Sequence, residues 1–176
     1  MSETKNAALY AVKSKNLKPE ERSKTFEEVA LGYDEEQAVE EAQRCLGCKN
    51  PACVEGCPVH VDIPHFIAAV KRSEFDKAYS LITADNALPA VTGRVCPQEK
   101  QCECRCVRGV KGEPVSIGLI ERFVADYHAG KLAGAGCEEE KCAYNAINEQ
   151  NQGENRAQSA EKKNMKVAVI GSGPSG

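Results

Sequence analysis

The sequence of 176 residues contains no tryptophan, and aromatic residues make up only 5% of it. Any hydrophobic core must therefore be lean and largely aliphatic. No run of about 18 apolar residues is present, so the sequence predicts no membrane-spanning helix and no membrane partner. The first residues are polar and of mixed charge, without the apolar stretch of a secretory signal, and they predict a cytoplasmic protein.

A strong charge of either sign is also missing. The formal net charge is −3 with 28% charged residues, which predicts no nucleic acid partner. The three histidines (His60, His65 and His128) are neither spaced as a metal-binding set nor tied to a nucleophile. No catalytic constellation is evident, so we expect no turnover from this chain alone.

Cysteine, by contrast, is abundant. Eight of the ten cysteines fall into two groups, at 45–57 and 96–106. Clustered thiols in a reducing compartment favour metal binding over disulfides. The remaining two, Cys137 and Cys142, lie in a polar stretch and are expected to be free or incidental thiols.

The hydrophobic pattern predicts an all-α domain, with no strand in the first 130 residues. We expect an N-terminal extension at 1–33, the helical domain at 34–132 and a linker at 133–164. Loops are expected at 46–58 and 86–97. We expect one helix to begin at Asp34, whose cap is completed by a reciprocal hydrogen bond from Gln37, and another to have Pro64 in its first turn. We expect Ser73 and Ser116 to cap two further helices, the last of which ends at Gly130.

The first cysteine group has the spacing Cys45-x2-Cys48-x4-Cys53-x3-Cys57, followed by Pro58. In two-cluster bacterial ferredoxins a similar run ends in Cys-Pro, and its last cysteine serves the other cluster. By analogy, Cys57 would cross to a second cluster that the 96–106 group completes. A zinc site built on the 45/48 pair is the alternative, and disulfides are a third.

The chain also resembles a known family. The segments RCLGCKNPACVEGCP (44–58), IPHF (63–66), LPAVTGRVCP (88–97) and VSIGLIERF (115–123) are similar to the N-terminal domain of the glutamate synthase small-subunit family. That domain is shared with dihydropyrimidine dehydrogenase and with the large subunit of electron-bifurcating ferredoxin:NADP oxidoreductases. The resemblance covers roughly residues 20–130 and implies an α-helical ferredoxin-like bundle with two [4Fe-4S] clusters.

The resemblance also implies the ligands. One cluster would take Cys45, Cys48, Cys53 and Cys106, and the other would take Cys57, Cys96, Cys102 and a side-chain oxygen at Glu121. A helical stripe with Ile117, Val124 and His128 supports Glu121 independently, because a carboxylate beside an apolar face needs a partner. Cys104 is the rival ligand. Nearby cations could raise the cluster potentials: Arg44, Lys49, Arg94, Arg105 and Arg108.

The last residues read KVAVIGSGPSG, in which Gly171, Gly173 and Gly176 follow a short apolar run. This pattern is the strand and turn that begin a dinucleotide-binding fold. We expect residues 165–176 to be the truncated start of an FAD- or NAD(P)-binding domain, too short to bind the cofactor here.

Together these features predict an electron-transfer module of a longer NAD(P)H-dependent flavin and iron–sulfur oxidoreductase. It would relay electrons between FAD or NAD(P)H of the parent and a large subunit or other redox partner. The alternatives are a zinc-binding or metal-free docking module without a redox role, and a thiol-based sensor using Cys104, Cys137 and Cys142.

Overall fold

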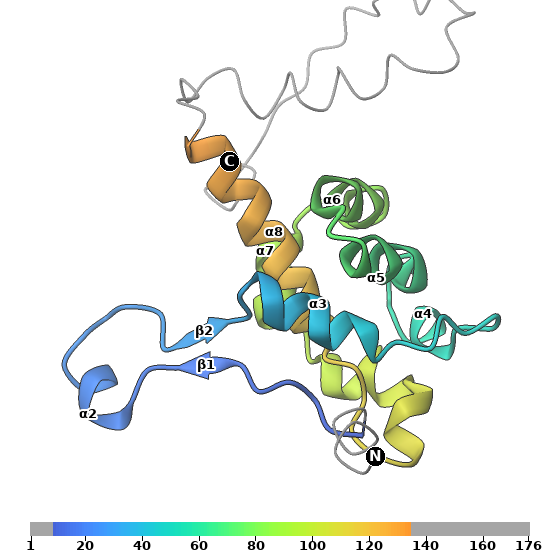
Figure 1. Cartoon of the computed structure of the whole chain (residues 1–176), viewed down its shortest axis with the longest axis horizontal. Helices are drawn as coiled ribbons and strands as arrows, with labels where there is room; N and C mark the ends of the chain where they lie inside the picture. Colours follow the sequence, from blue (N-terminus) through green and yellow to red (C-terminus); the bar gives the residue numbers. More distant parts are fainter. Residues whose placement is uncertain (1–8, 135–176) are drawn as a thin grey trace, which may run out of the picture. The chain divides into compact units, whose positions relative to one another are not determined.

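A computed structural model describes residues 9–134, which are mostly helical (Figure 1). The expected linker beyond residue 134 and the expected nucleotide-binding start lie outside the described residues. Within 9–134, no helix has the length and hydropathy to cross a membrane. The main elements are β1 (Lys15–Asn16), α2 (Pro19–Arg22), β2 (Ala30–Gly32), α3 (Glu35–Gln43), α4 (Ala52–Glu55), α5 (Ile63–Lys71), α6 (Phe75–Thr83), α7 (Pro89–Val95) and α8 (Ile117–Gly134). Three short 3-10 helices lie between α7 and α8, namely η1 (Gln98–Lys100), η2 (Glu103–Arg105) and η3 (Val107–Val110).

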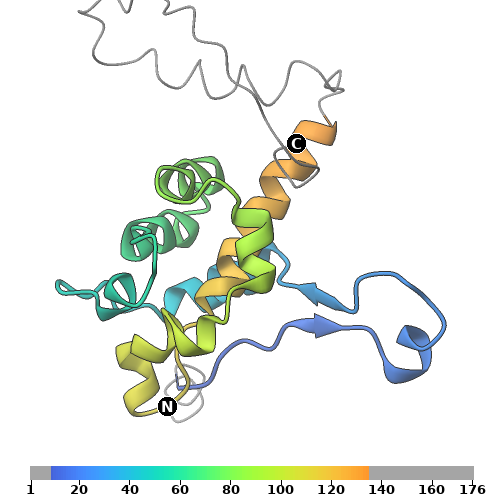
Figure 2. The ribbon, with the colours of Figure 1, turned by 180° about the vertical axis from the view of Figure 1, so that it is seen from behind.

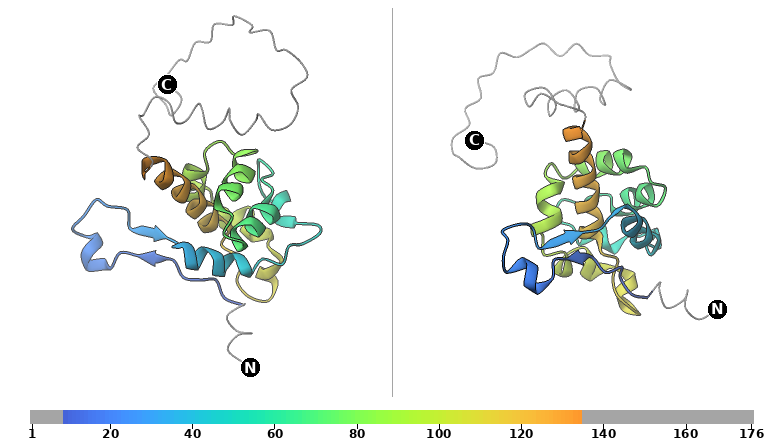
Figure 3. Two further views of the ribbon diagram at one scale, coloured as in Figure 1. Left: turned by 45° about the horizontal axis from the view of Figure 1, so that its top comes forward. Right: turned by 60° about the vertical axis from the view of Figure 1, so that its left-hand side comes forward.

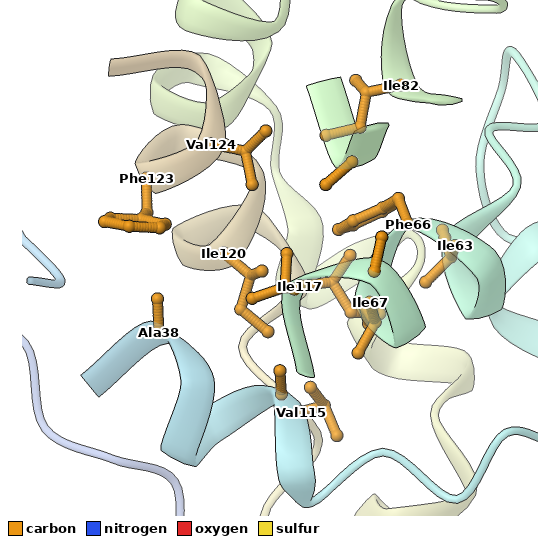
Figure 4. Close-up of a cluster of buried hydrophobic side chains, with 14 of the residues drawn as sticks. Ala38, Ile63, Phe66, Ile67, Ile82, Val115, Ile117, Ile120, Phe123 and Val124 are labelled. Carbon is orange, nitrogen blue, oxygen red and sulfur yellow. The ribbon is translucent and has the colours of Figure 1, made fainter. Parts of the chain in front are cut away.

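The hydrophobic core lies between α8 and the helices around it (Figure 4). Ile120 and Val124 of α8 are fully buried, and so are Phe66 and Ile67 of α5 and Ile82 of α6. Burying one such side chain stabilises the fold by about 1.5–3 kcal/mol. This aliphatic core fixes α8 against α5 and α6, and α7 packs along α8 as well (Figure 2).

The few aromatic residues are concentrated where α6 meets α8. The ring of Phe75 meets Phe123 edge-on at a centroid distance of 5.2 Å, and it meets Tyr127 at 4.8 Å. Edge-to-face pairs of this kind contribute about 0.5–1.5 kcal/mol beyond the area that they bury. They compensate in part for the absence of tryptophan.

Three of the expected helix starts are confirmed. Asp34 caps α3, because its Oδ1 accepts from the backbone N–H of Gln37 at 2.9 Å and its own N–H donates to Gln37 Oε1 at 3.1 Å. Pro64 lies in the first turn of α5, where its missing N–H has no helical partner to lose. Helix α8 begins directly after Ser116, as the sequence indicates.

Four local predictions are wrong. The expected loop at 46–58 contains the short helix α4. Ser73 does not cap α6, since its φ of 56° places it in the turn after α5 and Glu74 is the N-cap. The expected loop at 86–97 contains α7, whose Pro89 begins the helix and whose buried Gly93 packs on α8. Gly130 does not end α8, which continues to Gly134; an exposed glycine costs a helix only about 0.5–1 kcal/mol.

The prediction that the first 130 residues contain no strand is also wrong. β1 and β2 pair in an antiparallel ribbon, with Lys15 opposite Gly32 and Asn16 opposite Ala30 (Figure 3). Strands of two and three residues are too short to show an alternating pattern. Contacts from α8 hold the ribbon, since Arg122 donates to the Ala30 carbonyl at 2.6 Å.

Candidate metal centre

The first cysteine segment leaves the end of α3 and makes a tight loop. Cys45 follows α3, and Gly47 has a φ of 61°, a conformation that favours glycine. The short helix α4 carries Cys53, and Cys57 follows its end. These turns let successive thiols converge.

The second cysteine segment lies against the first. Cys96 ends α7, and η1 and η2 then lead to Cys102 and Cys106. Gly56 permits the contact, because a Cβ there would lie 2.7 Å from the Gln101 carbonyl oxygen. A larger residue would force the two segments apart.

Four of the expected ligands line one cavity. Cys45, Cys48 and Cys53 from the first segment and Cys106 from the second surround it. The rest of its wall is mostly apolar and includes Leu46, Ile63, Ile67, Val107, Val115 and Ile117. The structure therefore brings together the four cysteines that the resemblance assigns to one cluster.

The Cys53 thiol in this cavity is partly desolvated and lies within electrostatic reach of Cys45 and Cys106. Burial, together with negative charge on Cys106 and Cys45, raises the pKa of Cys53 to about 11. Thiolates that are buried together in this way require a cationic centre between them to become stable. The donor chemistry of the cavity fits an iron–sulfur cluster.

The other expected ligands form a separate group. Burial is the largest cause of the raised pKa of Cys96, followed by the charges of Glu121 and Cys57. Burial, together with the charges of Glu103, Cys57 and Glu121, raises the pKa of Cys102 to about 12. Cys96 and Cys102 thus each lie within electrostatic reach of both Cys57 and Glu121.

Glu121 extends from α8 toward the segment before and within α7. Its Oε1 accepts from Asn86 Nδ2 at 2.9 Å and from Thr92 Oγ1 at 2.6 Å. Burial raises the pKa of this carboxyl group, while the two hydrogen bonds oppose the rise. A desolvated carboxylate beside Cys96 and Cys102 is a suitable oxygen donor for a metal centre.

Residues 9–134 contain no group of three or more His, Cys, Asp or Glu side chains arranged to hold a single metal ion. The ligands of a four-iron cluster bind different irons around a cube and lie farther apart than the ligands of one ion. The eight cysteines of the described part form no disulfide with one another.

Cys104 is exposed, unlike the other cysteines of the described part. Its neighbours in sequence, Cys102 and Cys106, are buried and half-buried and belong to different groups. Cys137, Cys142 and the glycines expected to bind a nucleotide (Gly171, Gly173 and Gly176) lie outside the described residues.

The expected cations have different surroundings. Arg105 and Arg108 line the four-cysteine cavity. Lys49 is exposed in the loop between Cys48 and Cys53. Arg94 instead pairs with Glu28 at 2.9 Å and with Asp126, away from that cavity.

Arg44 lies one residue before Cys45 and forms a buried ion pair with Glu41. It therefore belongs to the core that supports the loop.

Sequence reasoning missed several residues around these groups. Lys71 of α5 donates to the Cys45 carbonyl at 2.6 Å, and Arg108 donates to the Arg44 carbonyl at 2.7 Å. Asn86 and Thr92 are the donors to Glu121, and a search for partners of that carboxylate in the LPAVTGRVCP segment could have suggested Thr92.

Comparison with known proteins gives a family match. Residues 22–133 match the model of dihydropyrimidine dehydrogenase domain II, the 4Fe-4S cluster domain. The chain is 34% identical over 151 residues to the NAD-dependent dihydropyrimidine dehydrogenase subunit PreT of Escherichia coli K12, covering 86% of this chain and 32% of that protein. It is 41% identical over 101 residues to the glutamate synthase [NADPH] small chain of the same strain, covering 57% and 21%. The glutamate synthase [NADPH] small chain of Halomonas elongata is 39% identical over 105 residues, covering 60% and 22%.

The chain spans about a third or less of the length of these relatives. The match agrees with the resemblance read from the four sequence segments. It covers most of the described residues, including both cysteine groups and Glu121.

Proposed function

Because this chain belongs to the dihydropyrimidine dehydrogenase domain II family of 4Fe-4S cluster domains, we propose that it transfers electrons through two such clusters. The observation that carries the proposal is the division of the expected ligands into two groups, one around the four-cysteine cavity and one around Glu121. Each group draws on both cysteine segments.

The first cluster takes Cys45, Cys48, Cys53 and Cys106. These four thiols share one cavity, whose wall is mostly apolar. Arg105 and Arg108 at the same cavity place positive charge near the site, which favours the reduced state of a bound cluster.

The second cluster takes Cys57, Cys96, Cys102 and Glu121. The buried Cys102 and the half-buried Glu121 support this assignment, as does the electrostatic effect of Glu121 on Cys96 and Cys102. The exposure of Cys104 favours Glu121 over Cys104 as the fourth ligand. A bound cluster of this kind accepts and releases one electron at a time without a proton-transfer group.

The parent of this chain is proposed to be a longer oxidoreductase in which FAD and NAD(P)H exchange electrons with the two clusters. Relatives that are named as subunits or small chains support a protein partner, which we propose to be a large subunit or another redox subunit. The chain itself contributes thiolates, a carboxylate and a mostly apolar cavity.

Iron and acid-labile sulfide measured on chain purified without oxygen test the proposal. We expect about eight of each per chain for two four-iron clusters. Cys102→Ser and Cys106→Ser should each lower both values toward about four, because each removes a ligand of one cluster. Cys104→Ser is the matched control from the same short segment and should keep about eight.

Two results would contradict the proposal in different ways. If the chain contains almost no iron but binds zinc, the electron-transfer proposal is wrong and the domain is a docking module. Loss of one cluster in Cys104→Ser, with none in Glu121→Ala, would leave electron transfer in place and assign the fourth ligand to Cys104.

A further inference from the structure

Asn86 and Thr92 converge on a single oxygen atom of Glu121. Asn86 Nδ2 and Thr92 Oγ1 both donate to Oε1, at 2.9 and 2.6 Å. The second carboxylate oxygen, Oε2, has no hydrogen-bond partner among residues 9–134. The two donors therefore distinguish the oxygens of one carboxylate.

The orientation of Asn86 is fixed by its own contacts. Its Oδ1 accepts from the backbone N–H of Leu88 at 3.2 Å, so its amide nitrogen must face the other way, toward Thr92 and Glu121. The residue is only 8% exposed, although asparagine is rarely buried without a structural or functional reason. A flipped amide would lose the bonds on both sides.

Thr92 is placed by the close packing of α7 on α8. Gly93, its neighbour, is buried, and a Cβ there would lie 2.9 Å from the backbone of Arg122. Because α7 lies so close to α8, the Thr92 hydroxyl reaches Glu121, the residue that precedes Arg122 on α8. The Thr92 hydroxyl also lies 2.7 Å from Asn86 Nδ2, so the three side chains form a closed network.

We propose that Asn86 and Thr92 are positioning residues that hold Oε1 of Glu121 and leave Oε2 to bind an iron of the second cluster. The inference rests on the proposed assignment of Glu121 as a ligand. With one oxygen held by two donors, the carboxylate binds through the other and keeps a single rotamer. A carboxylate without these donors can rotate, and the iron that it holds becomes the easiest one to lose.

The experiment compares Thr92→Val with two controls in the full chain, purified without oxygen. Thr92→Val removes the hydroxyl at nearly constant shape, and with it the bonds to Glu121, Asn86 and the Leu88 carbonyl. Thr92→Ser restores the hydroxyl. Thr83→Val removes a half-buried hydroxyl of the same type that bonds only to carbonyls within α6. Each protein is treated with the one-electron oxidant ferricyanide and measured by EPR and by iron and sulfide analysis.

Thr92→Val should lose one iron per chain on this treatment, from about eight to about seven, with sulfide unchanged. A three-iron cluster gives an EPR signal when oxidised, whereas an oxidised four-iron cluster gives none, so the signal should appear in Thr92→Val and in Glu121→Ala. Wild type, Thr92→Ser and Thr83→Val should keep their iron. Asn86→Asp, which keeps the acceptor for Leu88 but replaces the donor, should behave like Thr92→Val.

A purely structural role for the two residues predicts a different result. If Thr92→Val and Asn86→Asp keep all their iron and show no new EPR signal, the inference is wrong while the two-cluster function stands. If both variants lose both clusters together with their helicity by circular dichroism, the residues act in folding, and the inference is equally wrong. If the wild-type chain contains no iron, both the proposed function and this inference are wrong.

Discussion

Replacement of the buried Glu41 should destabilise the contacts that hold the first cysteine segment (45–57) in place. Its Oε2 accepts from the Val12 N–H at 2.7 Å, and its Oε1 accepts from the Ser116 N–H at 2.8 Å and from Arg44. Arg44 in turn donates to the Glu113 carbonyl at 2.6 Å. One carboxylate thus connects the N-terminal segment, the end of α3 and the start of α8.

The magnitude follows from burial. Glu41 is 0% exposed and the Arg44 side chain is 4% exposed, so neither charge is solvated by water. Removing one partner of a buried pair costs about 3–5 kcal/mol. Glu41→Gln keeps the shape and one acceptor oxygen, so we expect the lower end, about 3 kcal/mol. In addition, its amide would turn a donor toward the N–H of Val12.

The assay is loss of helicity in urea, followed by circular dichroism on the iron-loaded chain without oxygen. With a denaturant slope of about 1.5–2 kcal/mol per M, the midpoint for Glu41→Gln should fall by about 1.5–2 M. Glu40→Gln is the control, because Glu40 lies next to it on α3 but is exposed, and a surface change of this kind costs less than about 0.5 kcal/mol. Equal midpoints for the two variants would refute the argument that this ion pair supports the loop.

Three further predictions concern the metal centre. Gly56→Ala should lower iron per chain by at least about one cluster, because its methyl group would collide with a backbone carbonyl of the second cysteine segment; full iron content would count against the contact. Lys71→Met should lower the potential of the first cluster by about 40 mV, equivalent to about 1 kcal/mol for one electron, because it removes a cation bonded to the Cys45 carbonyl. Lys77→Met, in the exposed part of α6, should leave that potential unchanged in the same EPR-monitored titration. Iron chelation should unfold much of residues 45–125, and unchanged circular dichroism would show that the helices do not depend on metal.

Features that depend on a few neighbouring residues could be predicted from the sequence. The capping box of Asp34 and Gln37 and the first turn at Pro64 are local, and both are confirmed. The iron–sulfur chemistry could be predicted because it depends on cysteine spacing. Ser73 shows the limit, since a suitable cap residue is present but the preceding turn places it in a left-handed conformation.

Features that depend on distant contacts could not be predicted. Glu41, Lys71 and Asn86 act on residues that lie between 26 and 75 positions away, and no periodicity records such contacts. Their burial or short hydrogen bonds become evident only when α3, α5 and α8 pack together. Glu121 could be suggested from its helical stripe, but the two donors that hold it could not.

The proposed ligand sets also make assembly of the two clusters cooperative. Two ligands of the first set, Cys53 and Cys106, are the ends of an outer loop. The segment from Cys57 to Cys96, whose ends are ligands of the second set, is an inner loop nested within it. Closing a flexible loop of about 50 residues costs about 3.5 kcal/mol plus a constant. Once the first cluster closes the outer loop, the ends of the nested inner loop are already near each other, and Gly56 holds the two segments in contact. Binding of the first cluster therefore offsets part of the entropy that the second must overcome, and by linkage the second favours binding of the first to the same extent.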